Sequence, residues 1–212
     1  MLIAFDFDGT LSDSEMTVLL GEEAGVADEI ADVTEAAMND EIGYAESLRR
    51  RVDLLEGLSR DEIDRAFGRV RLRPGADEVL ADLQHTDHHV AILTGGFVRG
   101  VEAALDRAGA AVDTLVANEL GMDAERDVLT GEVSGPLIEG TKDEALDELC
   151  ITHGIDLDAT VAVGDGANDL PMLKVAGLAV GYDPKPAVEP HCDEVVHSME
   201  ELRRVFEEHG VF

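Results

Sequence analysis

Short apolar runs that end in acidic or glycine-rich turns recur along the chain. They lie at Met1–Phe5, His89–Leu93, Val112–Ala117 and Thr160–Val163, with shorter candidates at Leu178–Val180 and Glu194–Val196. Helical patterns separate them, at about residues 75–86, 97–108, 141–153 and 198–209. Strands that alternate with helices predict an α/β fold, a doubly wound parallel sheet with a Rossmann-like core. Sites in such sheets form at the carboxyl ends of the strands, where these turns lie.

Residues 14–72 interrupt the alternation. They contain only helical patterns, at Glu15–Ala24, Ala27–Met38, Tyr44–Glu56 and Arg60–Val70. This insertion after the first strand predicts a small helical cap over an α/β catalytic core formed by residues 1–13 and 73–212. Residues 121–137 contain two short extended runs, around Asp127 and Gly131, which favour a hairpin.

Three helix starts carry the pattern of a capping box: Ser59 with Glu62, Thr141 with Glu144, and Ser198 with Glu201. The Thr141 box places Lys142 in the first turn of its helix. A lysine there opposes the helix dipole unless an anion lies in front of it.

The charge balance is strongly acidic, with 47 acidic against 16 basic residues and a net charge of -31. The acids recur from Asp28 to Glu208, which argues against a disordered acidic tail. An acidic surface that binds a basic partner is one alternative. We favour a salt-rich cytoplasm, as in halophilic microbes, because the Debye length shrinks to about 3 Å at molar ionic strength. The sequence has no basic stripe, so we expect no nucleic-acid partner.

Targeting signals are not evident in the sequence. No segment is long and apolar enough to span a membrane, and the start at Met1 has no basic region before its short apolar run. The two cysteines, Cys150 and Cys192, form neither a metal-ligand spacing nor a disulfide framework. These features predict a cytoplasmic protein without membrane partners.

Two pairs of carboxylates follow apolar runs. Asp6 and Asp8 point to one face of an extended segment, and Gly9 allows a tight turn. Carboxylates this close repel each other unless a cation lies between them, and Mg²⁺ suits oxygen ligands near a phosphate. Asp165 and Asp169 lie in a second acidic turn with flanking glycines. Either pair alone could also be an ordinary strand-end turn.

A hydroxyl and a lysine complete the set of candidate residues. Thr94-Gly95-Gly96 ends another apolar run, and its hydroxyl and backbone N–H groups could hold phosphate oxygens. Lys142, one of only three lysines, could supply positive charge to the same anion. Taken singly, an ordinary turn and a surface lysine are the commoner interpretations.

Together, and in this order, these residues resemble the four motifs of the haloacid dehalogenase superfamily of phosphatases. The motifs correspond to Asp6-Phe-Asp-Gly-Thr10, Thr94, Lys142 and Gly164-Asp-Gly-Ala-Asn-Asp169. The resemblance covers nearly the whole chain, and the first and last motifs are the most specific. It implies Mg²⁺-dependent hydrolysis of a small phosphate monoester through an aspartyl-phosphate intermediate.

The resemblance also implies a role for each residue. Asp6 is the nucleophile, and Asp8 protonates the leaving group and then activates water. Mg²⁺ is held by Asp6, Asp165 and the backbone carbonyl of Asp8. Thr94 and Lys142 bind the transferring oxygens, and Asp169 supports Lys142. Further phosphate contacts come from Gly95, Gly96 and Asn168.

Within the superfamily the chain is most similar to the phosphoserine phosphatases. Glu15 follows Asp6 at that family's spacing, and the segment Glu46–Val52 places Arg51 at its substrate-binding arginine. A carboxylate and an arginine would bind the ammonium and the carboxylate of a phosphorylated amino acid. Two residues depart from the family: Thr94 replaces a serine, and Tyr44, an expected apolar wall, replaces a phenylalanine. The implied reaction is hydrolysis of O-phosphoserine to serine and phosphate, a step of serine biosynthesis.

Two other functions remain open at this stage. The chain could act on another small phosphomonoester, or transfer the phosphoryl group to a second alcohol instead of water. It could also be a non-catalytic acidic binding module on the same fold. The oligomeric state is not predicted.

Overall fold

The computed structural model describes residues 1–39 and 41–212; residue 40, within the range predicted as a cap, lies outside the described residues. The strands are β1 (Leu2–Phe5), β2 (His89–Phe97), β3 (Thr114–Asp123), β4 (Val128–Ser134), β5 (Thr160–Gly164), β6 (Leu178–Tyr182) and β7 (Glu194–Val196). The helices are α1 (Met16–Ala24), α2 (Ala27–Met38), α3 (Tyr44–Asp53), α4 (Arg60–Phe67), α5 (Ala76–Leu83), α6 (Val98–Ala108), α7 (Lys142–His153), α8 (Leu170–Val175) and α9 (Met199–Glu208).

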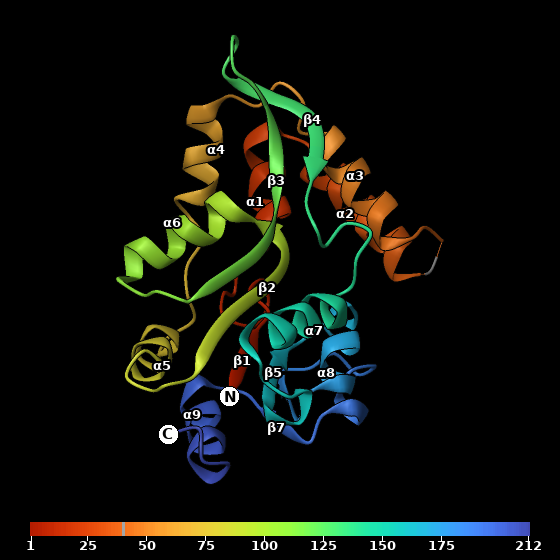
Figure 1. Cartoon of the computed structure of the whole chain (residues 1–212). Helices are drawn as coiled ribbons and strands as arrows, with labels where there is room; N and C mark the ends of the chain where they lie inside the picture. The colour runs from red at the N-terminus through yellow and green to blue at the C-terminus, as the bar shows by residue number, and fades with distance from the viewer. Residues whose placement is uncertain (40) are drawn as a thin grey trace.

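A single sheet forms the centre of the molecule, with strand order β4-β3-β2-β1-β5-β6-β7 (Figure 1). Every neighbouring pair is parallel except β3 with β4. From β1 the chain proceeds through β2 and β3 on one side, and later returns through β5, β6 and β7 on the other. The predicted doubly wound α/β fold is confirmed, and its topological switch point lies between β1 and β5.

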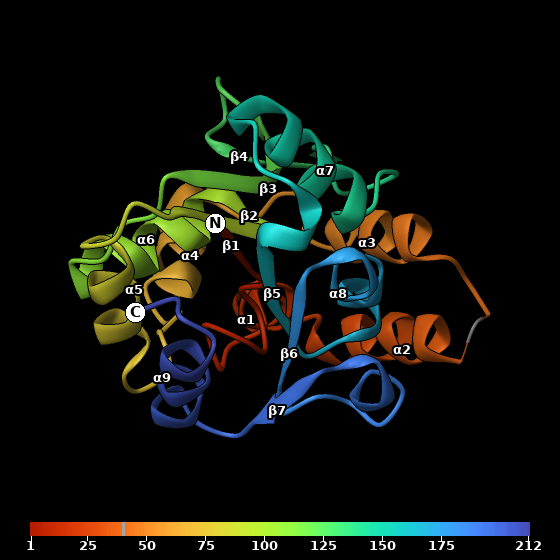
Figure 2. The same ribbon diagram turned by 60° about the horizontal axis from the view of Figure 1, so that its bottom comes forward.

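Both faces of the sheet are covered by helices (Figure 2). Leu2 and Ala4 of β1 pack in a cluster with residues of α7 and α8, whereas Ile3 and Phe5 pack in another cluster with residues of α5, α6 and α9. All four side chains are fully buried. Alternate residues of a strand point to opposite faces, so a strand covered on both faces is apolar throughout. This explains the unbroken apolar run before Asp6.

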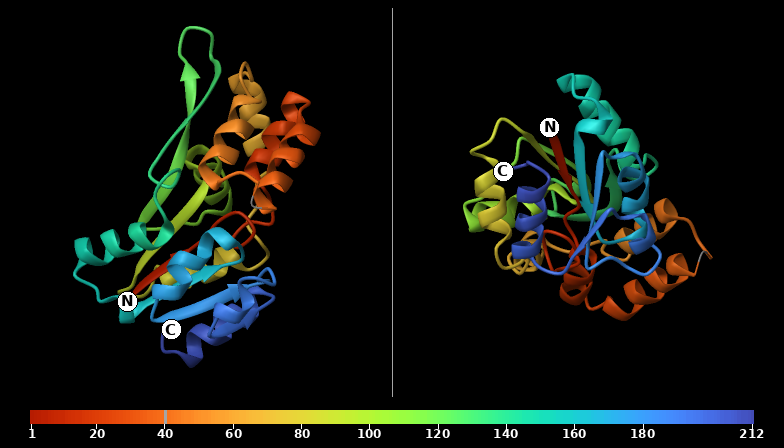
Figure 3. Two further views of the ribbon diagram at one scale, coloured as in Figure 1. Left: turned by 90° about the vertical axis from the view of Figure 1, so that its right-hand side faces the viewer. Right: turned by 90° about the horizontal axis from the view of Figure 1, so that it is seen from below.

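Helices α1–α4 form the insertion between β1 and α5. Helix α1 packs against α2 and α4, and α3 packs against α2 and β4. The β3–β4 hairpin extends from the same end of the sheet as these helices (Figure 3, left). It is joined to the α3–α4 loop by hydrogen bonds from the backbone N–H of Gly57 to the carbonyl of Leu129 and from the N–H of Leu129 to the carbonyl of Leu58, both 2.9 Å.

The structure differs from the sequence expectations in three places. β2 and β3 run further than predicted, to Phe97 and Asp123. The end of β2 still pairs with β3, at Phe97 and Asn118, and β3 continues as the first strand of the hairpin with β4. The six-residue helix α8 was not predicted, because its length gives little periodicity. The capping box at Ser198 is only half formed: its hydroxyl accepts from the N–H of Glu201, but the Glu201 carboxylate accepts from the N–H of His197 instead.

The other two predicted capping boxes, at Ser59 and Thr141, are present. Across residues 1–39 and 41–212, none of the helices combines the length and apolar character needed to cross a membrane.

Candidate active site

The loop after β1 brings Asp6 to the centre of the sheet edge. The backbone N–H of Asp6 donates to the carbonyl of Val163 on β5 at 2.9 Å, which continues the sheet pairing, and the residue is 2% exposed. Gly9 turns the loop with a φ of 91°. A Cβ atom there would lie 2.7 Å from Oδ1 of Asp165. Glycine is therefore required both for the turn and for the approach of the two loops.

Lys142 connects the two acidic loops. It is the first residue of α7, is only 4% exposed, and its Nζ donates to Oδ1 of Asp6 and Oδ1 of Asp169, both at 2.5 Å. The anions that a lysine at a helix start requires are thus two buried carboxylates. The short charge-assisted bonds hold the ammonium between β1 and the β5–α8 turn.

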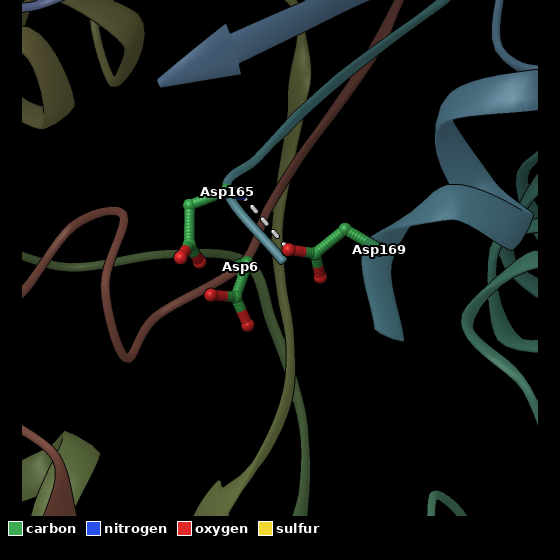
Figure 4. Close-up of side chains that lie close together, drawn as sticks. All are labelled: Asp6, Asp165 and Asp169. Carbon is green, nitrogen blue, oxygen red and sulfur yellow. Dashed lines mark hydrogen bonds between the residues drawn. The ribbon is translucent and has the colours of Figure 1, made fainter. Parts of the chain in front are cut away.

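Asp165 and Asp169 lie in the turn after β5 (Figure 4). Oδ2 of Asp169 accepts from the N–H groups of Asp165, at 3.0 Å, and Gly166, at 2.9 Å, while its Oδ1 accepts from Lys142. Both oxygens of Asp169 are therefore engaged within the protein. Carboxylate oxygens of Asp6, Asp165 and Asp169 lie within 4.8 Å of one another.

This cluster has more negative than positive charge. Burial, reinforced by Asp169, raises the pKa of Asp6 to about 8. Burial alone would lower the pKa of Lys142, but Asp169 and Asp6 raise it overall, so the lysine stays charged. Buried carboxylates of raised pKa gain from a further cation, and an all-oxygen donor set suits a hard divalent ion. The residues present therefore fit a metal such as Mg²⁺.

Asp8 has a different environment. Within residues 1–39 and 41–212, one carboxylate oxygen, Oδ1, is buried without a hydrogen-bond partner, and the other accepts a long bond of 3.4 Å from the N–H of Met16. Burial, followed by the negative charges of Glu15 and Asp6, raises the pKa of Asp8 well above its ordinary value. The protonated form of Asp8 is thus favoured, as a proton donor requires.

Thr94, Gly95 and Gly96 border the same space from β2. Oγ1 of Thr94 accepts from the N–H of Gly96 at 3.0 Å. A Cβ atom on Gly96 would lie 3.2 Å from both Oγ1 of Thr94 and Oδ2 of Asp8, and one on Gly95 would lie 2.0 Å from the hydroxyl oxygen of Tyr44. The structure therefore brings the Thr94 hydroxyl, the Asp8 carboxylate and the Tyr44 ring to one short stretch of backbone.

The inserted helices contribute Glu15 and Arg51. Glu15 is the residue before α1, and burial raises the pKa of its carboxyl. Nη1 of Arg51 donates to Oγ1 of Thr17 at 3.2 Å. Burial lowers the pKa of Arg51, and the charges of Tyr44, Glu15 and Asp8 offset this only in part. Arg51 thus faces the site.

The neighbouring arginines on α3 point elsewhere, as helical geometry requires. Arg49 pairs with Glu139 at 2.5 Å, and Arg50 pairs with Glu46 within its own helix. Asn168 is exposed, and its Oδ1 lies 2.7 Å from the position a Cβ on Gly166 would take, which places it at the rim.

Three residues of the site were not predicted. Nδ2 of Asn118 donates to the carbonyl of Gly95 at 3.0 Å, Nη2 of Arg73 donates to the carbonyl of Gly9 at 2.8 Å, and Nζ of Lys185 pairs with Oδ2 of Asp165 at 3.2 Å. Asn118 and Lys185 both follow predicted strands, Val112–Ala117 and Leu178–Val180. Because polar residues of a site gather at the ends of parallel strands, Asn118 and Lys185 could have been predicted from the sequence. Arg73 does not follow a predicted strand and could not.

The site combines a buried lysine between the aspartates that follow β1 and β5 with a helical insertion after β1. This combination is typical of one family of hydrolases. Residues 3–174 match the haloacid dehalogenase-like hydrolase family, and the chain belongs to that family. The predicted resemblance is confirmed.

Within this family, the chain is similar in sequence to phosphoserine phosphatases. The chain is 52% identical over 211 residues to the phosphoserine phosphatase of Halobacterium salinarum, with 99% of each chain covered. It is 37% identical to that of Methanocaldococcus jannaschii, with 91% of this chain and 90% of the relative covered.

Solved structures show the same similarity. A substrate-bound phosphoserine phosphatase complex matches with a TM-score of 0.87 and 34% identity, over 98% of this chain and 97% of the other. A phospho-aspartyl intermediate analogue of phosphoserine phosphatase matches with a TM-score of 0.87 and 35% identity, over 96% and 97% of the two chains.

Proposed function

We propose that this protein is a phosphoserine phosphatase that hydrolyses O-phosphoserine to serine and phosphate with Mg²⁺, through an aspartyl phosphate (an acyl phosphate) on Asp6. The contact that carries the proposal is the buried bridge from Lys142 to Asp6 and Asp169 beside Asp165. Relatives named as phosphoserine phosphatases, one of them with a phospho-aspartyl analogue, support the same reaction.

The proposed reaction has two steps. The carboxylate of Asp6 attacks phosphorus, the bond from phosphorus to the serine oxygen breaks, and Asp8 gives its proton to that oxygen. Asp8 then takes a proton from a water molecule, which attacks the phosphorus on Asp6 and releases inorganic phosphate. Lys142 and Thr94 bind the transferring oxygens, with Gly95, Gly96 and Asn168 as further contacts.

Asp6, Asp165 and the backbone carbonyl of Asp8 would hold the metal. When bound, Mg²⁺ offsets the repulsion between the anionic nucleophile and the anionic phosphate. Asp169 stays outside this ligand set, because its oxygens already accept three hydrogen bonds. It acts instead by orienting Lys142 and the turn that carries Asp165.

Glu15 and Arg51 would select the substrate. We assign residues 14–72 as a cap over the core, whose Glu15 pairs with the substrate ammonium and whose Arg51 grips the carboxylate. Tyr44 forms a wall beside the phosphate. A place in serine biosynthesis, in a cytoplasm rich in salt, agrees with this reaction and with the net charge of -31.

The test is phosphate release from a panel of small phosphomonoesters, with MgCl₂ and a series of KCl concentrations. We expect O-phosphoserine to have the highest kcat/KM and Asp6→Asn to abolish turnover. Arg51→Ala should lower kcat/KM for O-phosphoserine about 10- to 100-fold and leave p-nitrophenyl phosphate nearly unchanged, since the lost bonds contact only the amino-acid carboxylate.

Arg50→Ala is the matched control, because Arg50 pairs with Glu46 and should leave both substrates unaffected. An equal loss for both substrates in Arg51→Ala would contradict the amino-acid assignment and favour another phosphomonoester. Product appearing on an added alcohol would instead indicate phosphotransfer. No magnesium-dependent release at any salt concentration would leave a non-catalytic binding module.

A further inference from the structure

Lys185 is a second lysine at the site that the reaction above does not use. It lies in the loop after β6, and its Nζ is 3.2 Å from Oδ2 of Asp165. Its backbone N–H donates to the backbone carbonyl of Asp165 at 2.9 Å. A Cβ atom on Gly166 would lie 3.4 Å from the Nζ, so the ammonium lies above the turn that carries Asp165. Both the backbone and the side chain of Lys185 thus contact Asp165.

The two partners differ in accessibility. The Lys185 side chain is 55% exposed, whereas that of Asp165 is 11% exposed. Ion pairs with one exposed, flexible partner contribute little to stability, so such a contact is readily exchanged for another. The ammonium can leave Asp165 for solvent at small cost, while Asp165 stays in place in its turn.

Asp165 is also the residue to which the proposed function gives a metal. An ammonium and a divalent cation on the same carboxylate repel each other, so the two compete for it. Glu15 is a second acid near Lys185: burial raises the pKa of Glu15, and Lys185 is first among the charges that lower it.

We propose that Lys185 is a positioning residue that holds the Asp165 carboxylate while the metal is absent and is displaced when the metal binds. The proposal rests on the proposed function for the metal site itself. It goes further because it assigns the Lys185 ammonium as the cation that neutralises Asp165 in the metal-free enzyme. The consequence is that Lys185 weakens Mg²⁺ binding and keeps an acidic site neutralised between turnovers.

The test is Mg²⁺ titration by isothermal calorimetry, without substrate, on the wild type, Lys185→Met and Lys185→Arg. We expect Lys185→Met to bind Mg²⁺ roughly two- to fivefold more tightly, because a competing surface cation is lost. Lys185→Arg keeps the positive charge and should bind Mg²⁺ with the wild-type affinity. The difference should shrink as KCl approaches molar concentration, because salt screens the exposed ammonium.

Lys174→Met is the matched control. Lys174 is exposed on α8, so this variant loses the same charge away from Asp165 and should keep the wild-type affinity. Thermal melting of each variant establishes folding, and Lys185→Gln serves as a second neutral variant.

Two outcomes overturn the proposal in distinguishable ways. Equal or weaker Mg²⁺ binding by both neutral variants, with the wild type binding normally, refutes the role of Lys185 alone. Absence of Mg²⁺ binding by the wild type refutes the proposed metal site, and the role of Lys185 with it.

Discussion

Asp6 and Asp8 are both aspartates, two residues apart, but their carboxyl groups lie in different surroundings. Asp6 accepts a 2.5 Å bond from Lys142, whereas Oδ1 of Asp8 is buried and has no hydrogen-bond partner in the part of the chain that the structure describes. Burial raises the pKa of both, and Lys142 forms an ion pair with Asp6. Two carboxyl groups with environments this different suit two roles, and support Asp6 as nucleophile and Asp8 as acid.

The first prediction at this scale concerns Asp8→Asn. We expect kcat on O-phosphoserine to fall about 10²- to 10⁴-fold, because both steps lose their proton transfer. With p-nitrophenyl phosphate the leaving group needs no proton, so the first step should persist. Stopped-flow measurement should then show a burst of nitrophenol close to the enzyme concentration. Equal slow turnover on both substrates, without a burst, would count against Asp8 as the acid.

Much of the site was predictable because its residues follow apolar runs. Asp6, Thr94 and Asp165 each lie at the carboxyl end of a strand, where a parallel sheet gathers its polar residues. Arg73 was not predictable, because its bond to Gly9 depends on how the inserted segment returns to the core. Which of the three arginines on α3 faces inward also depends on packing, beyond the 100° rotation per residue.

At the scale of elements, Tyr44 at the start of α3 approaches Gly95 of β2 closely. The Tyr44 hydroxyl occupies the space where a Cβ on Gly95 would be, 2.0 Å away. A side chain on Gly95 would push the start of α3 away from the candidate phosphate site. The Tyr44 hydroxyl therefore leaves no room for a side chain at residue 95 in this arrangement.

We therefore predict that Gly95→Ala raises KM about tenfold or more, since overpacking at a well-fitted contact costs about 1–3 kcal/mol. The double variant Tyr44→Phe/Gly95→Ala should recover part of that loss, because the nearest remaining ring atom is 3.2 Å from the added methyl. Steady-state kinetics of the four proteins in a double-mutant cycle measure the coupling. Additive effects would contradict the predicted overlap.

A second prediction at this scale concerns β2 and α7. The ring of His89 stacks on that of His153 with centroids 3.8 Å apart, and its Nε2 contacts Oγ1 of Thr114 at 2.8 Å. Burial, and then the charge of His153, lowers the pKa of His89 below 6.5. Because the pKa of His89 is lowered in the folded state, the stabilisation of the fold by neutral His89 is present above its ordinary pKa of 6.5 and is lost as the pH falls below it.

The stability advantage of the wild type over His89→Gln should therefore shrink between pH about 7.5 and about 5, by about 1–2 °C in Tm, since His89 is partly exposed. Thermal melting followed by circular dichroism, at constant KCl, measures this difference. The Thr114→Val variant is the control, because it removes the polar contact and keeps the ring pair. A difference that does not change with pH would contradict the assignment.

The order of elements was predictable because helical and apolar patterns alternate cleanly. The bounds of α2 and β7 match the predicted ranges. The hairpin was predicted from extended runs around Asp127 and Gly131. Gly131 lies in β4, but Asp127 lies in the turn with a φ of 57°, and the first strand of the hairpin is β3. The strands were misplaced because β3 and β4 are half-buried and lack a regular apolar alternation. Their pairing with the α3–α4 loop is a tertiary effect that no local pattern carries.

At the scale of the whole molecule, the net charge of -31 governs behaviour in solution. At low ionic strength the acids repel each other over about 10 Å or more, which destabilises the compact state. The same field repels an anionic substrate. Salt therefore acts on folding and on substrate capture through one cause.

We expect Tm and kcat/KM both to rise between about 0.2 M and about 2 M KCl, with kcat/KM rising about tenfold as the field is screened. Differential scanning calorimetry and initial rates measure the two quantities. Sucrose at matched osmolarity is the control, since it is uncharged and should not raise kcat/KM. Full stability and activity at low salt would argue for a basic partner as the reason for the acids.

The residues proposed for bond breaking and those proposed for choosing the substrate arise from separate stretches of backbone. Asp6, Thr94 and Asp165 are attached to the central sheet, whereas Glu15, Tyr44 and Arg51 belong to the inserted helices or their edge. Exchanging a few side chains on those helices could therefore redirect a descendant of this chain to a new metabolite while its chemistry stayed intact. Such divergence would leave its trace mainly in residues 14–72.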